Sequence, residues 1–380
     1  MKIVIAIDSL KGSLTSIEAA GAIKSGILNV DNKAEVVIKP LADGGEGTAE
    51  ALVSGMGGQI HTLEVRGPLE ETVIARYGML EDSKTAIIEM AEAAGLPLVP
   101  VSQRNPLYTT TYGVGEMIKK CIQEGCRKFI VGIGGSATND AGLGMLMALG
   151  YKFYDAKGEE VCYGGQSLSK VCKIDEAAVL PELAACEFKI ACDVNNPLYG
   201  PNGAAAVYGP QKGATPEIVE ELDKGLQHFA EVVSNYKGQD LSKVVGAGAA
   251  GGLGFGFMAF LNGKLESGIQ IILDEINLEE ELKDADLVIT GEGRLDNQTA
   301  MGKAPIGVAK LAKKYNLPVI GFAGALAREA KKCNEEGIDA YFSIVNSAMT
   351  LEEAMNKENA IENMTKTVEQ VFNLIHVLNK

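Results

Sequence analysis

Three apolar segments of the chain each end in a polar, glycine-rich loop, and these loops hold the residues best suited to chemistry. The loops are residues 8–13, 134–142 and 291–303, which follow the runs IVIAI, FIVGI and LVIT. A strand that passes through such a loop into a helix presents backbone N–H groups and the positive end of the helix dipole, and both favour a bound anion. Each loop also carries carboxylate, hydroxyl or cationic side chains. This combination predicts an enzyme that handles phosphate groups.

The first loop, DSLKGS, contains Lys11, whose ammonium group can contact a phosphate as a point charge. Ser9 and nearby backbone N–H groups can add hydrogen bonds to the same phosphate. The alternative is an ordinary surface turn with a solvated lysine, and the residue types alone do not separate the two. The first loop of an α/β sheet often carries a ligand, so we keep Lys11 as a catalytic candidate and Ser9 as a phosphate-binding one.

The second loop, GGSATND, gives the strongest local signal. Gly134 and Gly135 allow a close approach of backbone to ligand, and Ser136, Thr138 and Asn139 offer side-chain donors for phosphoryl oxygens. It is not a P-loop, because the pattern G-x-x-x-x-G-K-[ST] is absent from the sequence. A purely structural turn would not need so many hydroxyl and amide side chains. We therefore expect these five residues to bind phosphate or nucleotide.

Acidic residues in two places could hold Mg²⁺. Asp43 and Glu46 lie in DGGEG, and magnesium is commonly held by one or two carboxylates together with waters. Capping of the following helix is the competing interpretation for both. Asp296, in the third loop, is a further metal candidate. Its neighbours Arg294 and Lys303 could neutralise a carboxylate or a phosphate.

Another polar pair follows the run FKIAC. Asp193 and Asn195 stand together where this predicted strand ends, so they could orient a hydroxyl group and accept its proton, as the base of a kinase does. The alternative is an Asx turn imposed by the Asn-Pro dipeptide that follows. Lys212, in a turn further along, is a candidate contact for an anionic substrate.

The segment Gly246–Gly251 fits the dinucleotide pattern G-x-G-x-x-G literally. The apolar run before it is only two residues long, and no clean βαβ unit surrounds it, so we interpret it as a loop that packs closely against a ligand or another domain. A nicotinamide-dependent oxidoreductase that uses this segment stays open, as does a sugar-acid sensor without catalytic activity.

The order of the predicted elements indicates two domains. Strands alternate with helices in the first 60 residues and again in the last hundred, which is typical of a parallel α/β sheet. Thr15 and Glu18 have the spacing of a capping box and place the start of the first helix. Each end is too short to cover a sheet alone, so we expect residues 1–65 and 286–380 to form one discontinuous, doubly wound, Rossmann-like domain. Residues 66–285 would form an inserted second α/β domain, with the active site in the cleft between the two.

Composition excludes several classes of protein. A length of 380 residues suits two domains, and a net charge of −15 argues against long contacts with nucleic acid or an anionic membrane. The seven cysteines are scattered and form no C-x-x-C pair, which favours a reducing compartment. No segment reaches the roughly 20 apolar residues of a membrane helix, and we expect a cytoplasmic protein.

Taken in order, the motifs DSLKGS, PLADGGEG, GIGGSATNDAGLG, CDVNNPLYGPNGAAAVYGPQKGA, GAGAAGGLG and GEGRLDNQTAMGKAPIGVA resemble those of the glycerate kinase family of bacterial glyoxylate and sugar-acid catabolism. The resemblance spans nearly the whole chain. It implies ATP-dependent phosphorylation of D-glycerate with Mg²⁺, with 2-phosphoglycerate favoured over 3-phosphoglycerate as the product. It also implies that the discontinuous domain is flavodoxin-like. D-glycerate would be the partner, without nucleic acid or membrane, and a homodimer stays open.

The resemblance also raises the weight of the loops around Lys11, Ser136 and Asp193. In the reaction that it implies, Lys11 and the 134–139 loop would contact phosphates, and Asp193 would orient the attacking hydroxyl and accept its proton. Asp43, Glu46 and Asp296 stay metal candidates. Arg294 or Lys212 would bind the glycerate carboxylate, with Asn195 as a further substrate contact.

Overall fold

The computed structural model describes residues 1–42, 44–45, 47–80 and 84–378, and it divides the chain into two compact units. The first unit comprises Met1–Asp43, Glu50–Gly57 and Ile269–Lys380, and the second comprises Gly44–Ala49 and Gly58–Gly268. The inserted domain was predicted to span residues 66–285. No helix in the described part of the chain is both long and apolar enough to cross a membrane.

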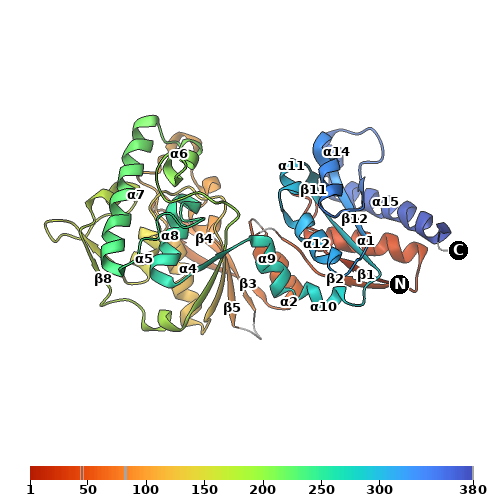
Figure 1. The fold of residues 1–380 in the computed structure, drawn as a ribbon, viewed down its shortest axis with the longest axis horizontal. Coiled ribbons are helices and arrows are strands. Elements are labelled where there is room, and N and C mark those ends of the chain that lie inside the picture. Colours follow the sequence, from red (N-terminus) through yellow and green to blue (C-terminus); the bar gives the residue numbers. More distant parts are fainter. Residues whose placement is uncertain (43, 46, 81–83, 379–380) are drawn as a thin grey trace. The chain divides into compact units, whose positions relative to one another are not determined.

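The first unit is built on a parallel sheet of five strands in the order β13-β12-β11-β1-β2 (Figure 1). Numbered along this sheet only, the order is 2-1-3-4-5 read from the β2 edge, which is the flavodoxin-like form of a doubly wound sheet. The predicted fold class is thereby confirmed. The strands of this sheet are β1 Lys2–Ile5, β2 Glu35–Ile38, β11 Leu287–Leu295, β12 Val319–Leu326 and β13 Ala340–Ser343.

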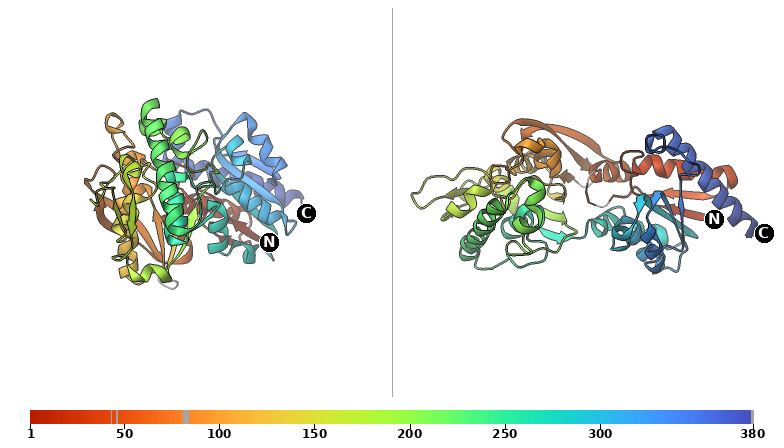
Figure 2. Two further views of the ribbon diagram at one scale, coloured as in Figure 1. Left: turned by 60° about the vertical axis from the view of Figure 1, so that its left-hand side comes forward. Right: turned by 90° about the horizontal axis from the view of Figure 1, so that it is seen from above.

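Helices α1 and α15 cover one face of this sheet and lie side by side (Figure 2). They share an apolar core with strand residues such as Ile3, Ile5 and Phe322. Gly26 allows the close contact, because a Cβ atom at this position would lie 2.7 Å from the carbonyl oxygen of Thr365. The helices of this unit are α1 Ser16–Val30, α2 Thr48–Met56, α9 Gly268–Glu275, α10 Leu278–Leu282, α11 Asn297–Ala300, α12 Ala304–Lys313, α13 Lys332–Glu335, α14 Leu351–Met355 and α15 Lys357–Leu378.

The start of α1 follows from local sequence. The Thr15 hydroxyl accepts a hydrogen bond from the backbone N–H of Glu18 at 3.2 Å, and the Glu18 carboxylate accepts one from the N–H of Thr15 at 3.0 Å. This reciprocal pair is the capping box that the spacing predicts, and it satisfies two N–H groups that would otherwise lack a partner. It fixes the point at which the 8–13 loop gives way to helix.

The second unit contains a mixed sheet of six strands in the order β10-β9-β6-β5-β4-β3. The hairpin β3-β4 is antiparallel and so is the pair β4-β5, whereas β5, β6, β9 and β10 run parallel to one another. A separate antiparallel pair joins β7 and β8. The strands of this unit are β3 Gln59–Arg66, β4 Thr72–Leu80, β5 Thr85–Glu89, β6 Lys128–Gly132, β7 Lys152–Tyr154, β8 Lys173–Asp175, β9 Glu187–Ala191 and β10 Lys264–Glu266.

The helices of the second unit enclose a large apolar core that includes Phe129, Phe188, Phe229 and Phe257. They are α3 Ala91–Ala94, α4 Tyr112–Gln123, α5 Leu143–Ala148, α6 Ala204–Tyr208, α7 Pro216–Lys237 and α8 Ala249–Leu261. Short 3₁₀ helices occur in both units, at Leu96–Leu98, Val101–Gln103, Gly165–Lys170, Pro181–Ala185, Pro210–Lys212 and Arg328–Lys331.

Candidate active site

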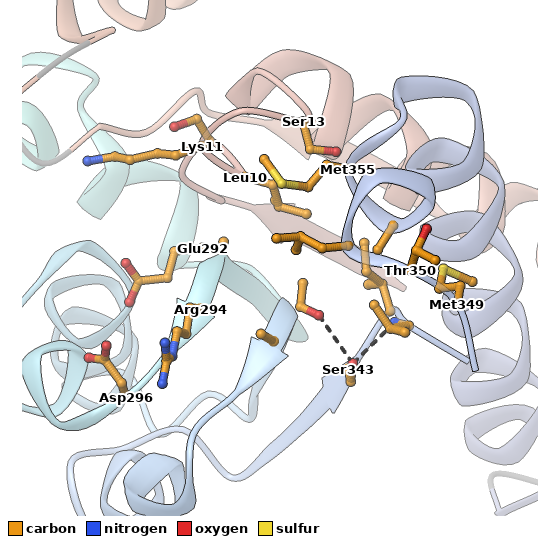
Figure 3. Close-up of a pocket in the computed structure, with 18 of the residues that line it drawn as sticks. Leu10, Lys11, Ser13, Glu292, Arg294, Asp296, Ser343, Met349, Thr350 and Met355 are labelled. Carbon is orange, nitrogen blue, oxygen red and sulfur yellow. Dashed lines mark hydrogen bonds between the residues drawn. The ribbon is translucent and has the colours of Figure 1, made fainter. Parts of the chain in front are cut away.

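A cavity of about 760 Å³ lies in the first unit where the carboxyl ends of β1, β11, β12 and β13 meet (Figure 3). The loop after β1 contributes Ser9 and Lys11, and the end of β11 contributes Arg294 and the adjoining Asp296. Strands β1 and β11 are the neighbours at which the order of this sheet reverses, and α/β sheets bind ligands at such a switch point. The structure thus brings four of the predicted site residues into one cavity.

Charged side chains gather on one side of this cavity. Lys11, Arg294 and Lys303 supply cations, and Glu292 adds a carboxylate. Figure 3 shows Lys11, Glu292, Arg294 and Asp296 together on that side. In a chain with a net charge of −15, three cations against the two carboxylates of Glu292 and Asp296 leave the lining of this cavity with a net positive charge. Such a group can attract and hold an anionic ligand.

Asp296 has a structural task in addition to its place in the cavity. One of its carboxylate oxygens, Oδ1, accepts hydrogen bonds from the N–H groups of Gln298 at 2.8 Å and Thr299 at 3.2 Å, so this residue caps α11. The Thr299 hydroxyl in turn donates to the carboxylate of Glu292. These bonds tie the end of β11 to α11. Sequence analysis did not select Glu292 or Thr299, although both stand in the polar 291–303 loop.

Asp296 is the metal candidate whose surroundings the structure describes. Asp43 and Glu46 lie outside the described residues. Among the described residues, no group of three or more His, Cys, Asp or Glu side chains is placed to hold a metal ion. Of the three metal candidates, Asp296 is the one that the described residues include, and its Oδ1 atom is engaged in the helix cap.

In the second unit, the parallel strands β5, β6, β9 and β10 bring a further group of polar residues to the carboxyl edge of their sheet. The 134–139 loop follows β6, and Asp193 follows β9. The Asp193 carboxylate accepts hydrogen bonds from the Ser267 hydroxyl at 3.0 Å and from the Gly268 N–H at 3.1 Å, both just after β10. The exposed side chain of Asp193 is therefore held in a fixed orientation. Asn195 is also exposed.

Lys212 is buried beneath the 134–139 loop. Its side chain is only 2% exposed, and its ammonium group donates to the Ser136 hydroxyl at 2.7 Å and to the Thr138 carbonyl at 2.6 Å. Burial lowers the pKa of Lys212 to about 7, although the carboxylate of Asp140 acts in the opposite direction. In this structure Lys212 positions the loop.

The same loop holds buried polar atoms that have no hydrogen-bond partner. They are the Thr138 hydroxyl and both the oxygen and the nitrogen of the Asn139 side-chain amide. Buried polar groups are nearly always paired, so unpaired ones in a native structure indicate strain, function or a missing ligand. Gly134, Gly135 and Ser136 belong to this loop as well. Six predicted residues, Lys212 included, thus form one cluster in the second unit.

Asp140 is a residue that sequence analysis placed in the loop but did not select. Its carboxylate is fully buried and accepts four hydrogen bonds, from the N–H and hydroxyl of Thr111 and from the N–H groups of Gly142 and Gly144. Burial raises the pKa of Asp140, and these donors oppose the shift. The carboxylate fixes the turn from the loop into α5. Two glycines just after the aspartate were the available sequence signal.

Glycines allow other segments to pack against this edge. Gly251 has a φ of +68°, and a Cβ atom there would lie 2.0 Å from the carbonyl oxygen of Thr138, so the glycine-rich segment packs directly on the loop. No strand precedes Gly246, because residues 238–248 form turns and coil. The dinucleotide interpretation of Gly246–Gly251 lacks its structural context. Gly44 is packed similarly, since a Cβ atom there would lie 2.7 Å from that of Ala191.

Comparison with known proteins decides the family. The model of the glycerate kinase family matches residues 3–376. The chain belongs to the glycerate kinase family. A Bacillus subtilis (strain 168) relative named glycerate kinase is 49% identical over 371 residues, which cover 98% of this chain and 97% of the relative. An Escherichia coli (strain K12) relative named glycerate 2-kinase is 51% identical over 354 residues, 93% of each chain.

A solved structure agrees with this assignment. A crystal structure described as glycerate kinase 2 from Salmonella typhimurium LT2 has 47% sequence identity and a TM-score of 0.92, and the match covers 100% of this chain and 99% of that one. The protein is accordingly an enzyme with glycerate kinase activity, which is phosphoryl transfer to an alcohol group. The family resemblance inferred from the motifs is confirmed.

Proposed function

We propose that the enzyme transfers the γ-phosphoryl group of Mg-ATP to the 2-hydroxyl of D-glycerate, which yields 2-phosphoglycerate and ADP. The observation that carries this proposal is the cavity at the switch point of the first sheet, which Lys11, Arg294 and Lys303 line. Phosphoryl transfer depends on positioning and on stabilising charge on the phosphate, which such cations supply. The relative named glycerate 2-kinase supports the 2-hydroxyl as the acceptor.

Each group of residues has a proposed part in this reaction. Lys11 and Ser9, both in the first unit, are proposed phosphate contacts, and so are the residues of the 134–139 loop in the second unit. For the glycerate carboxylate we favour Arg294, which lines the cavity, over Lys212, which is buried and already donates to Ser136 and Thr138. A guanidinium group can bind a carboxylate through two parallel hydrogen bonds, which also fixes its orientation.

Asp193 is the proposed base. As the hydroxyl oxygen of glycerate forms its bond to the γ-phosphorus, the bond between that phosphorus and the β–γ bridging oxygen breaks, and Asp193 takes the hydroxyl proton. The hydrogen bonds from Ser267 and Gly268 hold the carboxylate in one orientation, as a base must be held. Asn195, two residues further on, is the proposed contact for a second oxygen of the substrate.

The described residues are compatible with Mg²⁺. This ion is bound largely by substrate phosphates and waters with one or two carboxylates, so it does not require a cluster of three protein ligands. Asp296 could contribute its second carboxylate oxygen, because only Oδ1 is engaged in the cap of α11. When bound, Mg²⁺ would neutralise charge on the phosphates. Asp43 and Glu46 stay candidates from the sequence.

We also propose that the enzyme works in the cytoplasm, where ATP is abundant. All seven cysteines are free thiols, which suits a reducing compartment.

The test is to measure ADP release from Mg-ATP with D-glycerate, L-glycerate, glycolate or no acceptor, and to identify the product by phosphorus NMR. Release that requires D-glycerate, with the phosphorus coupled to the single proton on C2, is the expected result. Coupling to two protons would instead show phosphorylation of the 3-hydroxyl. No ADP release with any acceptor would refute the proposal.

A further inference from the structure

The cavity of the first unit has two chemically different sides. Opposite the charged side lies a wall of apolar side chains from the segment that follows β13, with Met349, Thr350 and Met355 visible in Figure 3. The apolar members of this wall, called the apolar wall below, are Ile344, Val345, Met349, Leu351, Ala354 and Met355. None of them was selected from the sequence.

The backbone holds the apolar wall in place. Thr350 caps α14 through a capping box, in which its hydroxyl accepts from the N–H of Glu353 at 3.2 Å and its own N–H donates to the Glu353 carboxylate at 2.8 Å. Met355 lies directly over the 8–13 loop, because a Cβ atom added to Gly12 would come within 2.6 Å of the Met355 methyl carbon. The apolar wall and the 8–13 loop therefore border the same space.

Two large apolar side chains of the wall face water in this structure. Leu351 is 75% exposed and Met355 is 38% exposed. Single exposed apolar residues are common, but several that converge on the wall of a cavity are typical of a ligand site. A ligand that covered them would remove this apolar surface from water, which is favourable.

The occupant must match both sides and the volume. A cavity of about 760 Å³ is of the size that binds drug-sized molecules, far beyond the needs of a three-carbon acid. The ligand needs a flat apolar part that can cover the wall and several negative charges that can pair with Lys11, Arg294 and Lys303. Thioether groups such as those of Met349 and Met355 also make favourable contacts with aromatic rings. A nucleoside triphosphate has this combination of parts.

We infer that the apolar wall binds the nucleobase of the phosphoryl donor, with the polyphosphate extending from it to the cations on the opposite side. This inference rests on the proposed use of a nucleoside triphosphate. It assigns the segment 344–355 a direct part in nucleotide binding and makes the first unit the principal nucleotide site.

The test compares Leu351→Gln with Leu378→Gln, because Leu378 is 74% exposed, close to the value for Leu351, and does not line the cavity. Calorimetry gives the dissociation constants of each variant for Mg-ATP and for magnesium tripolyphosphate, which has the phosphates but no base. We expect Leu351→Gln to weaken ATP binding about fivefold, the effect of losing roughly 1 kcal/mol of apolar contact, and to leave tripolyphosphate binding unchanged. Lys11→Ala should weaken both ligands, and Leu378→Gln neither.

Several outcomes would overturn the inference. These are unchanged ATP binding in Leu351→Gln, an equal loss for tripolyphosphate, or a rise in the KM for D-glycerate without a rise in the KM for ATP. Because the calorimetry requires no turnover, the two proposals fail separately. Wild-type protein that binds ATP through the wall but phosphorylates no glycerate refutes the proposed function alone. Normal turnover of ATP and D-glycerate, with ATP binding unchanged by Leu351→Gln, refutes this inference alone.

Discussion

Burial of Lys212 should make the stability of the enzyme depend on pH in a specific direction. In the folded protein the pKa of Lys212 is about 7, against 10.5 for an exposed lysine. Between these two values the unfolded chain binds one more proton than the folded chain, so the free energy of unfolding rises with pH. Below pH 7 both states carry the proton, and Lys212 adds no pH dependence. The perturbation is Lys212→Met, which keeps most of the length of the side chain and removes the titrating group.

The size of the effect follows from the same two pKa values. The limiting slope is about 1.4 kcal/mol per pH unit. Because the group is half titrated at pH 7, the free energy of unfolding of the wild type should rise by about 2 kcal/mol relative to Lys212→Met between pH 7 and pH 9. The carboxylate of Asp140 is present in both proteins, and it raises the pKa of Lys212 against the larger lowering that burial causes.

The assay is urea unfolding followed by far-ultraviolet circular dichroism at pH 6, 7, 8 and 9, since the chain has no tryptophan. The comparison uses the transition that Lys212→Met shifts, because two units can unfold separately. Carbon-13 labelling of lysine side chains gives an independent measurement, in which the resonance missing from Lys212→Met should titrate near pH 7. A difference in stability that stays constant from pH 7 to pH 9, with a titration midpoint above 9, would refute the reasoning.

Three further substitutions test other parts of the structure. Asp193→Asn should lower kcat by about 10²–10⁴-fold while urea unfolding stays unchanged, because it removes the proposed base from an exposed position; near-normal turnover would reject that role. Arg294→Ala should raise the KM for D-glycerate by about tenfold or more, because at least one charge-assisted hydrogen bond is lost. Arg294→Lys should restore only part of the affinity for D-glycerate. An unchanged KM in steady-state assays would mean that the carboxylate binds elsewhere. Asp140→Asn should lower the free energy of unfolding, measured in urea, by about 1–3 kcal/mol. The amide has one acceptor oxygen, so it cannot accept from Gly142 while that oxygen accepts from Thr111 and Gly144. An unchanged free energy of unfolding would show that the carboxylate charge is not needed in this turn.

Much of the first unit could be predicted from the alternation of strands and helices. In a parallel sheet the carboxyl ends of all strands lie at one edge, so loops as distant in sequence as Lys11 and Arg294 were expected to meet. Alternation in residues 59–66 and 72–80, with Gly67 in the turn between them, is the local signal of the antiparallel hairpin β3-β4. The parallel pairing of β6 with β5 and β9 has no such local signal, because strand partners depend on contacts that no local pattern records.

The candidate site shows where local patterns stop being informative. Lys212 was expected to be an anion contact, and its position under the 134–139 loop depends on tertiary packing that buries a charged residue, which is rare. The apolar wall has no local signal, because the pattern from Thr350 onward does not show where the helix is interrupted. In the structure α14 ends at Met355 and α15 starts at Lys357, which leaves Leu351 and Met355 at the cavity.

The pairing of β1 with β11 has a consequence for synthesis on the ribosome. Ile3 pairs with Leu287, so β1 emerges from the ribosome long before its neighbour β11, the central strand of the first sheet, exists. At about 5–20 residues per second, translation of the intervening chain takes on the order of tens of seconds. The second sheet, with all its strands between residues 59 and 266, can form in that interval. Until β11 arrives, the early strands present unpaired apolar edges, which makes the nascent chain a natural client for chaperones that bind exposed strands.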